Sequence, residues 1–235
     1  KRSWLFSCRT VHGFTSECSI TNSHLHSVLA ENLDILQDDV KYCKSEEADQ
    51  RMIRHVISCA KNGYKRVDVK TVDTDVLMLM ISVYPVIRTH CPLLSLYCCH
   101  GLGKSQKFYN IVKIAAELGD DICMALPFFY AFSGCDTVSS FYGISKSKLW
   151  NRWMESANQK LFTNLFKKLS DQPDKISNLD LDILELFLIE VYYPNTSVVS
   201  LNEERKDHFL RMADMNIRNL PVSRSALLEH AKRAC

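Results

Sequence analysis

The stretch Lys70–Met80, KTVDTDVLMLM, decides how this chain folds. The β-branched residues just before and within it predict a strand over residues 67–72, and a buried apolar run follows the two aspartates. Asp73 and Asp75 therefore lie after the carboxyl end of a predicted central strand, the edge where open α/β sheets bind ligands. Two carboxylates there can hold a divalent metal ion, whereas an isolated D-x-D motif is more often a turn and a helix N-cap.

Composition narrows the class of protein. The chain has 235 residues, with 46% hydrophobic and 24% charged residues and a net charge of +2, as expected for a soluble globular protein of one large or two small domains. The longest apolar run, residues 76–87, contains Pro85 and is too short to span a bilayer, so no membrane partner is expected. Because the chain starts at Lys1 and stops at Cys235 within a helical pattern, we expect a fragment, truncated at both ends.

The ten cysteines are scattered, several lie in apolar runs, and no C-x-x-C pair occurs. This pattern predicts reduced, buried thiols in an intracellular protein and gives a structural zinc site little support. The group formed by Cys91, Cys98, Cys99 and His100 is interpreted as core packing rather than a metal site.

A basic segment covers residues 146–170. Lysines at the start of a helix oppose its dipole, so a phosphate partner is a candidate reason for them, although a solvated helix face is the commoner explanation. The segment contains one acid, Glu155, and six basic residues: Lys146, Lys148, Arg152, Lys160, Lys167 and Lys168.

Two further acidic sites accompany Asp73 and Asp75. A helix predicted to begin at Ser45 and to end at Asn62-Gly63 carries Glu46, Glu47 and Asp49 in its first turn. These acids either compensate the helix dipole or point toward the same end of the sheet as Asp73 and Asp75. Later, an apolar segment over residues 125–132 ends in Gly134-Cys135-Asp136, where the aspartate is either a turn residue or a ligand.

Periodicity and turn residues define the remaining elements. Residues 103–105, GKS, resemble a P-loop only superficially, because the required earlier glycine is Cys98, so a hairpin turn is preferred. The other predicted elements are an amphipathic helix over residues 23–36, strands over 93–99 and 108–112, and helices over 111–118, 149–166, 179–193, 201–215 and 223–234.

In combination, these motifs resemble the flap endonuclease branch of the PIN-like nucleases. Glu47-Ala48-Asp49 resembles that family's E-A-E, residues 73–77 its D-x-D, and Gly134-Cys135-Asp136 its G-S-D. The resemblance is closer to an uncharacterised, mobile-element-associated metazoan group, whose late L-P-x-x-x-x-A-L-x-x-H-x-x-R-A block matches residues 220–234. It covers roughly residues 24–235, and the order of the motifs is more specific than any one of them.

The resemblance implies an α/β fold: a partial PIN-like, three-layer domain with a mainly parallel central sheet over residues 1–150, and a helical C-terminal extension over 151–235 packing on it. It also implies a two-metal Mg²⁺ or Mn²⁺ site, likened to the family's catalytic centre, and phosphate contacts from basic side chains. The implied metal ligands and catalytic residues are Glu47, Asp49, Asp73, Asp75 and Asp136, and the implied nucleic-acid contacts are Lys146, Lys148 and Arg152.

The expected function is a structure-selective 5′ nuclease-like phosphodiesterase, with DNA favoured over RNA and a nuclear location over a cytoplasmic one. The chain departs from the family pattern at Cys135, which replaces a serine. It also lacks the family's aspartates from upstream strands, because Asp34, Asp38 and Asp39 lie in the wrong context to replace them. The alternatives are a catalytically dead nuclease fold of transposon origin that binds nucleic acid or protein, and a structural α/β domain with capping acids.

Overall fold

The computed structural model describes residues 3–9, 15–21, 48–172, 175–194, 200–211 and 220–235. It is an α/β structure that divides into two compact units, residues 1–123 and 124–235. The division falls within helix α5 (Asp120–Phe132), earlier than the boundary predicted after residue 150. As a consequence, Asp136 and the basic segment belong to the second unit.

The sheet of the first unit has five strands in the order β2-β1-β3-β4-β5. The strands are β1 (Ser3–Arg9), β2 (Thr15–Thr21), β3 (Arg66–Thr71), β4 (Ser95–His100) and β5 (Lys107–Asn110). β3 and β4 are parallel, whereas β1 pairs with β2 and β3, and β5 with β4, in antiparallel fashion. The expectation of a mainly parallel sheet is therefore wrong: hairpins at both edges make it a mixed sheet.

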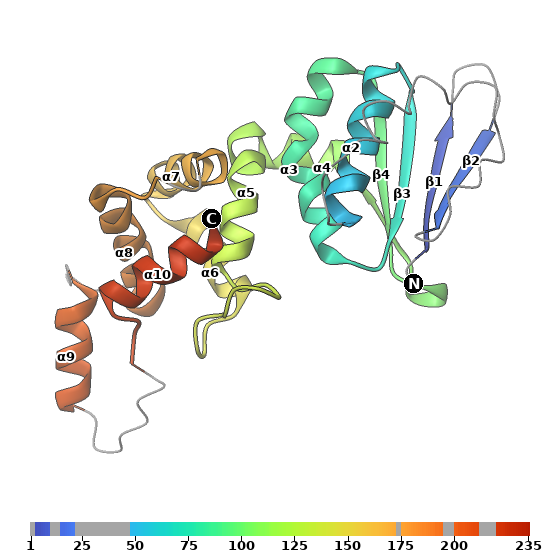
Figure 1. Cartoon of the computed structure of the whole chain (residues 1–235). Coiled ribbons are helices and arrows are strands. Elements are labelled where there is room, and N and C mark those ends of the chain that lie inside the picture. Colours follow the sequence, from blue (N-terminus) through green and yellow to red (C-terminus); the bar gives the residue numbers. More distant parts are fainter. Residues whose placement is uncertain (1–2, 10–14, 22–47, 173–174, 195–199, 212–219) are drawn as a thin grey trace. The chain divides into compact units, whose positions relative to one another are not determined.

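The central strand alternates between a buried and an open side. Val67, Val69 and Thr71 are buried, while Arg66, Asp68 and Lys70 between them are half-exposed. In this unit, the described helices lie on one side of the sheet (Figure 1), over the buried residues. The three-layer arrangement thus stays a prediction, and the amphipathic helix predicted over residues 23–36 lies outside the described residues.

Three helices cover that side: α2 (Ala48–Lys61), α3 (Thr74–His90) and α4 (Ile111–Leu118). α3 packs between α2 and α4 and also contacts β3 and β4, which gives a β–α–β unit built on the sequence that follows Thr71. The predicted hairpin after β4 is confirmed: residues 103–105 form a single 3-10 turn (η2), and His100 then pairs with Lys107. Among the described helices, none has both the length and the apolar character needed to cross a bilayer.

Helices make up the second unit, and aromatic side chains fill its core. Trp153, Phe162, Phe166 and Phe187 are fully buried and meet edge-to-face, with ring centroids 5.1 to 5.3 Å apart. Besides α5, the helices are α6 (Lys146–Glu155), α7 (Gln159–Asp171), α8 (Asn178–Tyr192), α9 (Leu201–Arg211) and α10 (Arg224–Ala234).

The single basic helix predicted over residues 149–166 is wrong, because the chain turns between α6 and α7. The Ser156 hydroxyl accepts a hydrogen bond from the Asn158 backbone N–H at 2.9 Å, a local bond that competes with helix continuation. α6 and α7 each have a stripe of buried apolar residues at helical spacing. The spacing continues from one stripe to the next, so the sequence resembles that of a single helix.

An ion-pair clasp joins α8, α9 and α10. The buried Glu185 carboxylate accepts a hydrogen bond from the Leu201 backbone N–H at 2.8 Å and a second from the Arg224 guanidinium. Arg224 also reaches Asp182 at 2.5 Å, so one guanidinium bridges two acids of α8. A buried carboxylate is stable only when paired in this way, and the clasp therefore fixes α10 on α8.

Candidate functional site

The carboxyl end of β3 is organised by helix capping. Asp73 has extended backbone angles (φ −100°, ψ 128°), and its Oδ1 accepts a hydrogen bond from the Asp75 backbone N–H at 3.0 Å. The Asp73 N–H in turn donates to the hydroxyl of buried Thr71 at 2.9 Å. The N-cap interpretation of Asp73 is thus confirmed, and a metal-binding role stays a prediction.

Asp75 lies in the first turn of α3, where the helix dipole favours a negative charge. The side chains of Asp73 and Asp75 are both half-buried at the carboxyl edge of the sheet. The structure therefore places the D-x-D motif at the edge expected from the sequence, with one aspartate outside the helix and the other inside it.

The lengths of α2 and β3 place Asp49 at the same end of the first unit as Asp73 and Asp75. α2 has 14 residues and is about 21 Å long. β3 has 6 residues and is about 20 Å long. A tight turn at Gly63 reverses the chain between them, with the Tyr64 N–H donating to the Cys59 carbonyl at 3.1 Å. The start of α2 thus lies level with the end of β3, and Asp49 is in the first turn of α2.

His100 lies at this edge, at the end of β4. From the sequence alone it was predicted to be part of the core. It is the parallel register partner of Thr71, so the ends of β3 and β4 are neighbours. Its Nε2 is buried and has no hydrogen-bond partner within the described part of the chain. A buried nitrogen without a hydrogen bond lowers the stability of the fold by about 1–3 kcal/mol. The imidazole of His100 is therefore a further candidate ligand at this edge.

The remaining predicted ligands are not brought together with this edge by the described structure. Glu47 lies outside the described residues, and Asp136 belongs to the second unit. Asp136 is exposed in a turn closed by reciprocal backbone hydrogen bonds between Cys135 and Val138, at 2.9 and 3.3 Å. Over residues 48–172 and the other described ranges, no three His, Cys, Asp or Glu side chains form a group that could hold a metal ion.

The lysines at the start of α6 differ in their surroundings. Lys146 is half-buried, its Nζ lies 3.3 Å from the Tyr130 ring centroid, and it donates to the Tyr130 carbonyl at 3.4 Å. A cation–π contact thus gives Lys146 a structural partner that sequence periodicity did not reveal. Lys148 is exposed and its backbone N–H is capped by Ser145 at 3.1 Å, and Arg152 is half-buried one turn later.

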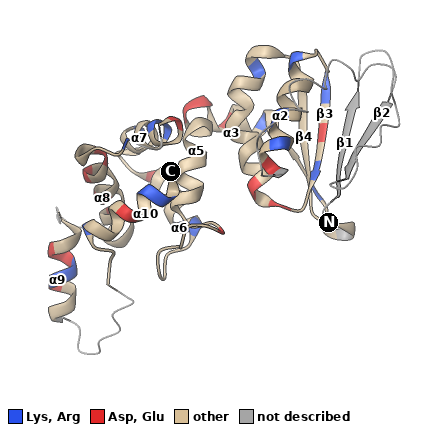
Figure 2. Ribbon diagram, viewed as in Figure 1, with Lys and Arg blue, Asp and Glu red and all other residues tan. Residues whose placement is uncertain are grey.

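The basic segment as a whole is partly neutralised. Lys168 forms a salt bridge with buried Asp180 at 2.7 Å. Lys and Arg are spread over several helices of this unit, with acidic segments between them (Figure 2). A phosphate-binding surface, if present, would therefore be local to α6 rather than the full length of residues 146–170.

The cysteines of β4 fit the core interpretation. Cys98 is fully buried, and burial raises the pKa of its thiol to about 12. Burial also raises the pKa of Cys99. Five of the seven cysteines assigned in the described part of the chain are buried, as predicted, whereas Cys135 is half-buried and Cys235 is exposed. Cys98 and Cys99, with their raised pKa values, remain protonated at neutral pH.

Comparison with known proteins adds no relative: no family model matches the chain, and searches of curated proteins and of solved structures returned no match.

Proposed function

We propose that this chain is a divalent-metal-dependent phosphodiesterase that acts on nucleic acid, in the manner of the flap endonuclease branch. The observation that carries the proposal is the meeting of the starts of α2 and α3 at one edge of the sheet, which brings Asp49 to the same end as Asp73 and Asp75. Carboxylate oxygens are the hard ligands that Mg²⁺ and Mn²⁺ prefer, so the chemistry of these donors fits the metal.

In this proposal the carboxylates of Glu47, Asp49, Asp73 and Asp75 hold the metal. Bound Mg²⁺ or Mn²⁺ would supply Lewis-acid stabilisation of the charge that develops on the scissile phosphate. Lys148 and Arg152 contact backbone phosphates without reading sequence, and Lys146 joins them only by leaving the ring of Tyr130. DNA is the proposed substrate, and a nuclear location is proposed with it.

The test is a cleavage assay with the chain on flapped and gapped DNA, and on RNA of the same design, with Mg²⁺ or Mn²⁺. Cleavage should fall to the metal-free level in Asp75→Asn and in Asp49→Asn, because each removes a ligand charge with little change in shape. Glu117→Gln is the matched control, since this exposed α4 acid forms a surface ion pair with Lys113 at 3.9 Å. Cleavage by both folded aspartate variants at the wild-type rate would overturn the assignment.

A second candidate is an interaction module built on an inactive nuclease fold of transposon origin. It is favoured by the structural roles that already account for Asp73, as a helix cap, and Lys146, as a partner of Tyr130. This candidate predicts nucleic-acid binding without cleavage and no rise in melting temperature with Mn²⁺, because a ligand of the native state must stabilise it.

A further inference from the structure

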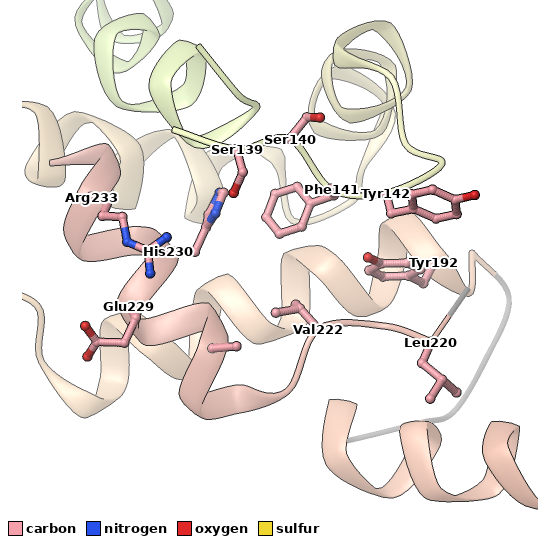
Figure 3. Close-up of a pocket in the computed structure, with 11 residues that line it drawn as sticks. Ser139, Ser140, Phe141, Tyr142, Tyr192, Leu220, Val222, Glu229, His230 and Arg233 are labelled. Carbon is pink, nitrogen blue, oxygen red and sulfur yellow. The ribbon is translucent and has the colours of Figure 1, made fainter. Parts of the chain in front are cut away.

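The second unit contains a cavity of about 470 Å³ that the proposed nuclease chemistry does not use. It lies between the loop after α5, the end of α8, the segment before α10 and α10 itself (Figure 3). Every residue that lines it falls within residues 124–235, so the cavity belongs to one compact unit. Its volume is in the range of small-molecule sites, about 300–1,000 Å³.

One side of the cavity is aromatic. Phe141 is buried and Tyr142 is 56% exposed, and both line the cavity. Tyr192, from the end of α8, is partly buried, which raises its phenol pKa, and it shares a hydrogen bond with the Val222 backbone. Figure 3 shows the rings of Tyr142 and Tyr192 on the same side of the cavity. These faces can stack against a planar ring.

The other side comes from α10 and carries one uncompensated positive charge. Glu229 is neutralised by a salt bridge to Lys232 at 2.8 Å. Arg233 is exposed, lines the cavity, and makes no salt bridge with any residue that the structure describes. The charge of Arg233 helps to lower the pKa of Glu229, but Glu229 is already paired with Lys232, so the three side chains leave one net positive charge. A guanidinium has five donors, and a phosphate matches its geometry.

His230 supplies a fixed hydrogen-bond acceptor between these two sides. Its Nε2 donates to the Phe132 carbonyl at 2.8 Å, so Nδ1 of the neutral imidazole is an acceptor. The ring is held between Phe132 and Phe141, at centroid distances of 5.1 and 4.5 Å. Ser139 and Ser140 add hydroxyl groups on the adjoining wall. Together these atoms suit the amino and hydroxyl groups of a nucleoside.

The cavity also brings together two segments that lie far apart in the sequence. Leu220, Ala226, His230 and Arg233 belong to the C-terminal L-P…A-L…H…R-A block, and all four line the cavity. The opposite wall, residues 139–142, begins three residues after Asp136. Segments 78 or more residues apart in sequence thus share one surface, with a hydrophobic face, a cation and an acceptor.

From this arrangement we propose that the cavity binds a nucleoside monophosphate, with its base on the aromatic wall of Tyr142 and Tyr192 and its phosphate on Arg233. The proposal does not depend on the nuclease function. The same chemistry is offered by a free mononucleotide and by one unpaired nucleotide of a strand, and the experiment separates these sources.

The experiment is isothermal titration calorimetry of the full chain with AMP in EDTA, so that binding is measured without divalent metal. Adenosine, ribose 5-phosphate and inorganic phosphate are titrated in parallel. AMP should bind at least about tenfold more tightly than any of the three, because only AMP uses both walls. Equal binding of adenosine or of phosphate alone would overturn the proposal.

Variants locate the binding. Arg233→Gln and Tyr142→Ala should each raise the Kd for AMP about tenfold or more, and both side chains are exposed enough to leave the fold intact. The matched controls are exposed Lys160→Gln and Phe209→Ala, which should leave the Kd unchanged. Unchanged affinity in both test variants would show that AMP binds elsewhere.

The source of the nucleotide is decided by titrating a tetranucleotide against the same variants. Tighter binding than AMP, with the same sensitivity to Arg233→Gln and Tyr142→Ala, would assign the cavity to an unpaired nucleotide of a strand. Weaker binding than AMP would assign it to a free mononucleotide. Either result supports a nucleotide site.

Discussion

At the scale of single residues, Gly134 is a position where only glycine fits. Its φ is +105°, and a Cβ there would lie 2.8 Å from Ser140 Cβ and 2.9 Å from Ser140 Cα. The close approach sets the path of the chain into Ser139–Tyr142, one wall of the cavity. The backbone at the end of α5 therefore determines where the aromatic side chains of the cavity stand.

We expect Gly134→Ala to destabilise the protein by about 3 kcal/mol or more, because a strained φ and a backbone overlap add together. Gly143→Ala is the control: its φ is +71°, but a Cβ meets nothing within 4 Å, so it should cost only about 1 kcal/mol. Urea unfolding of both variants measures the difference. Equal losses would show that the contact with Ser140 relaxes freely.

Two roles of Asp73 can be tested separately: capping the start of α3 and supplying a negative charge to a metal ion. Asp73→Ala removes the acceptor for the Asp75 N–H and should cost about 1 kcal/mol of unfolding free energy, whereas Asp73→Asn keeps an acceptor and should cost a few tenths at most, about 0.3 kcal/mol. If the carboxylate also holds a metal ion, both variants should lose the rise in melting temperature that Mn²⁺ causes. Retention of that rise in Asp73→Asn would leave Asp73 with the cap alone.

At the scale of secondary-structure elements, α7 and α8 are connected through one buried carboxylate. Asp180 is 4% exposed, forms a capping box with Ser177, and accepts the Lys168 ammonium at 2.7 Å. Burial raises its pKa, but hydrogen bonds from Lys168 and Ser177 outweigh burial and leave the pKa below its usual 3.8. The charged form is thus the one that the folded state prefers.

The lowered pKa of Asp180 makes the free energy of unfolding depend on pH. The stabilisation from Asp180 is complete above the unfolded-state pKa of 3.8 and is lost as the pH falls through the lower folded-state pKa. We expect Asp180→Asn to cost about 1–3 kcal/mol at pH 7 and little at pH 2. Urea unfolding between pH 7 and pH 2 measures this, with exposed Asp171→Asn as the control. A pH-independent loss would assign Asp180 a packing role instead.

Elements with a strong local signal were the ones that sequence predicted well. The end of α2 at Asn62-Gly63 and the end of α4 at Gly119 are decided by residues within one turn, and both are present. The turn between α6 and α7 was missed because the apolar periodicity continues across it. The local hydrogen bond from the Asn158 N–H to the Ser156 hydroxyl, which competes with helix continuation, was not evident from that periodicity. β1 and β2 were missed because the pairing of β1 with β3, and of β2 with β1, is not encoded in their own periodicity.

At the scale of the whole molecule, the two units have separate hydrophobic cores. Met80 is fully buried in the first unit, and Phe187 is fully buried in the second. Strand direction and the division of the chain depend on contacts between distant segments, so the sequence supported an α/β class but not the mixed sheet or the position of Asp136 in the second unit. The candidate edge at Asp73 was predictable, because a strand followed by a cap is a local pattern.

Separate cores predict separate melting transitions. In differential scanning calorimetry, Met80→Ala should lower one transition and Phe187→Ala the other, each by the equivalent of about 3 kcal/mol. Val86→Ala and Leu179→Ala, at positions 48% and 67% exposed, are the matched controls and should move neither. A single transition lowered by both core variants would show that the units unfold together.

The hydrogen bond from His230 to the Phe132 carbonyl has a consequence for the order of folding. The two residues are 98 positions apart, and the carbonyl belongs to the last residue of α5. During synthesis, this carbonyl leaves the ribosome long before its partner, at about 5–20 residues per second. Water must satisfy it until α10 emerges, so the second unit completes its fold only after its final helix has been made.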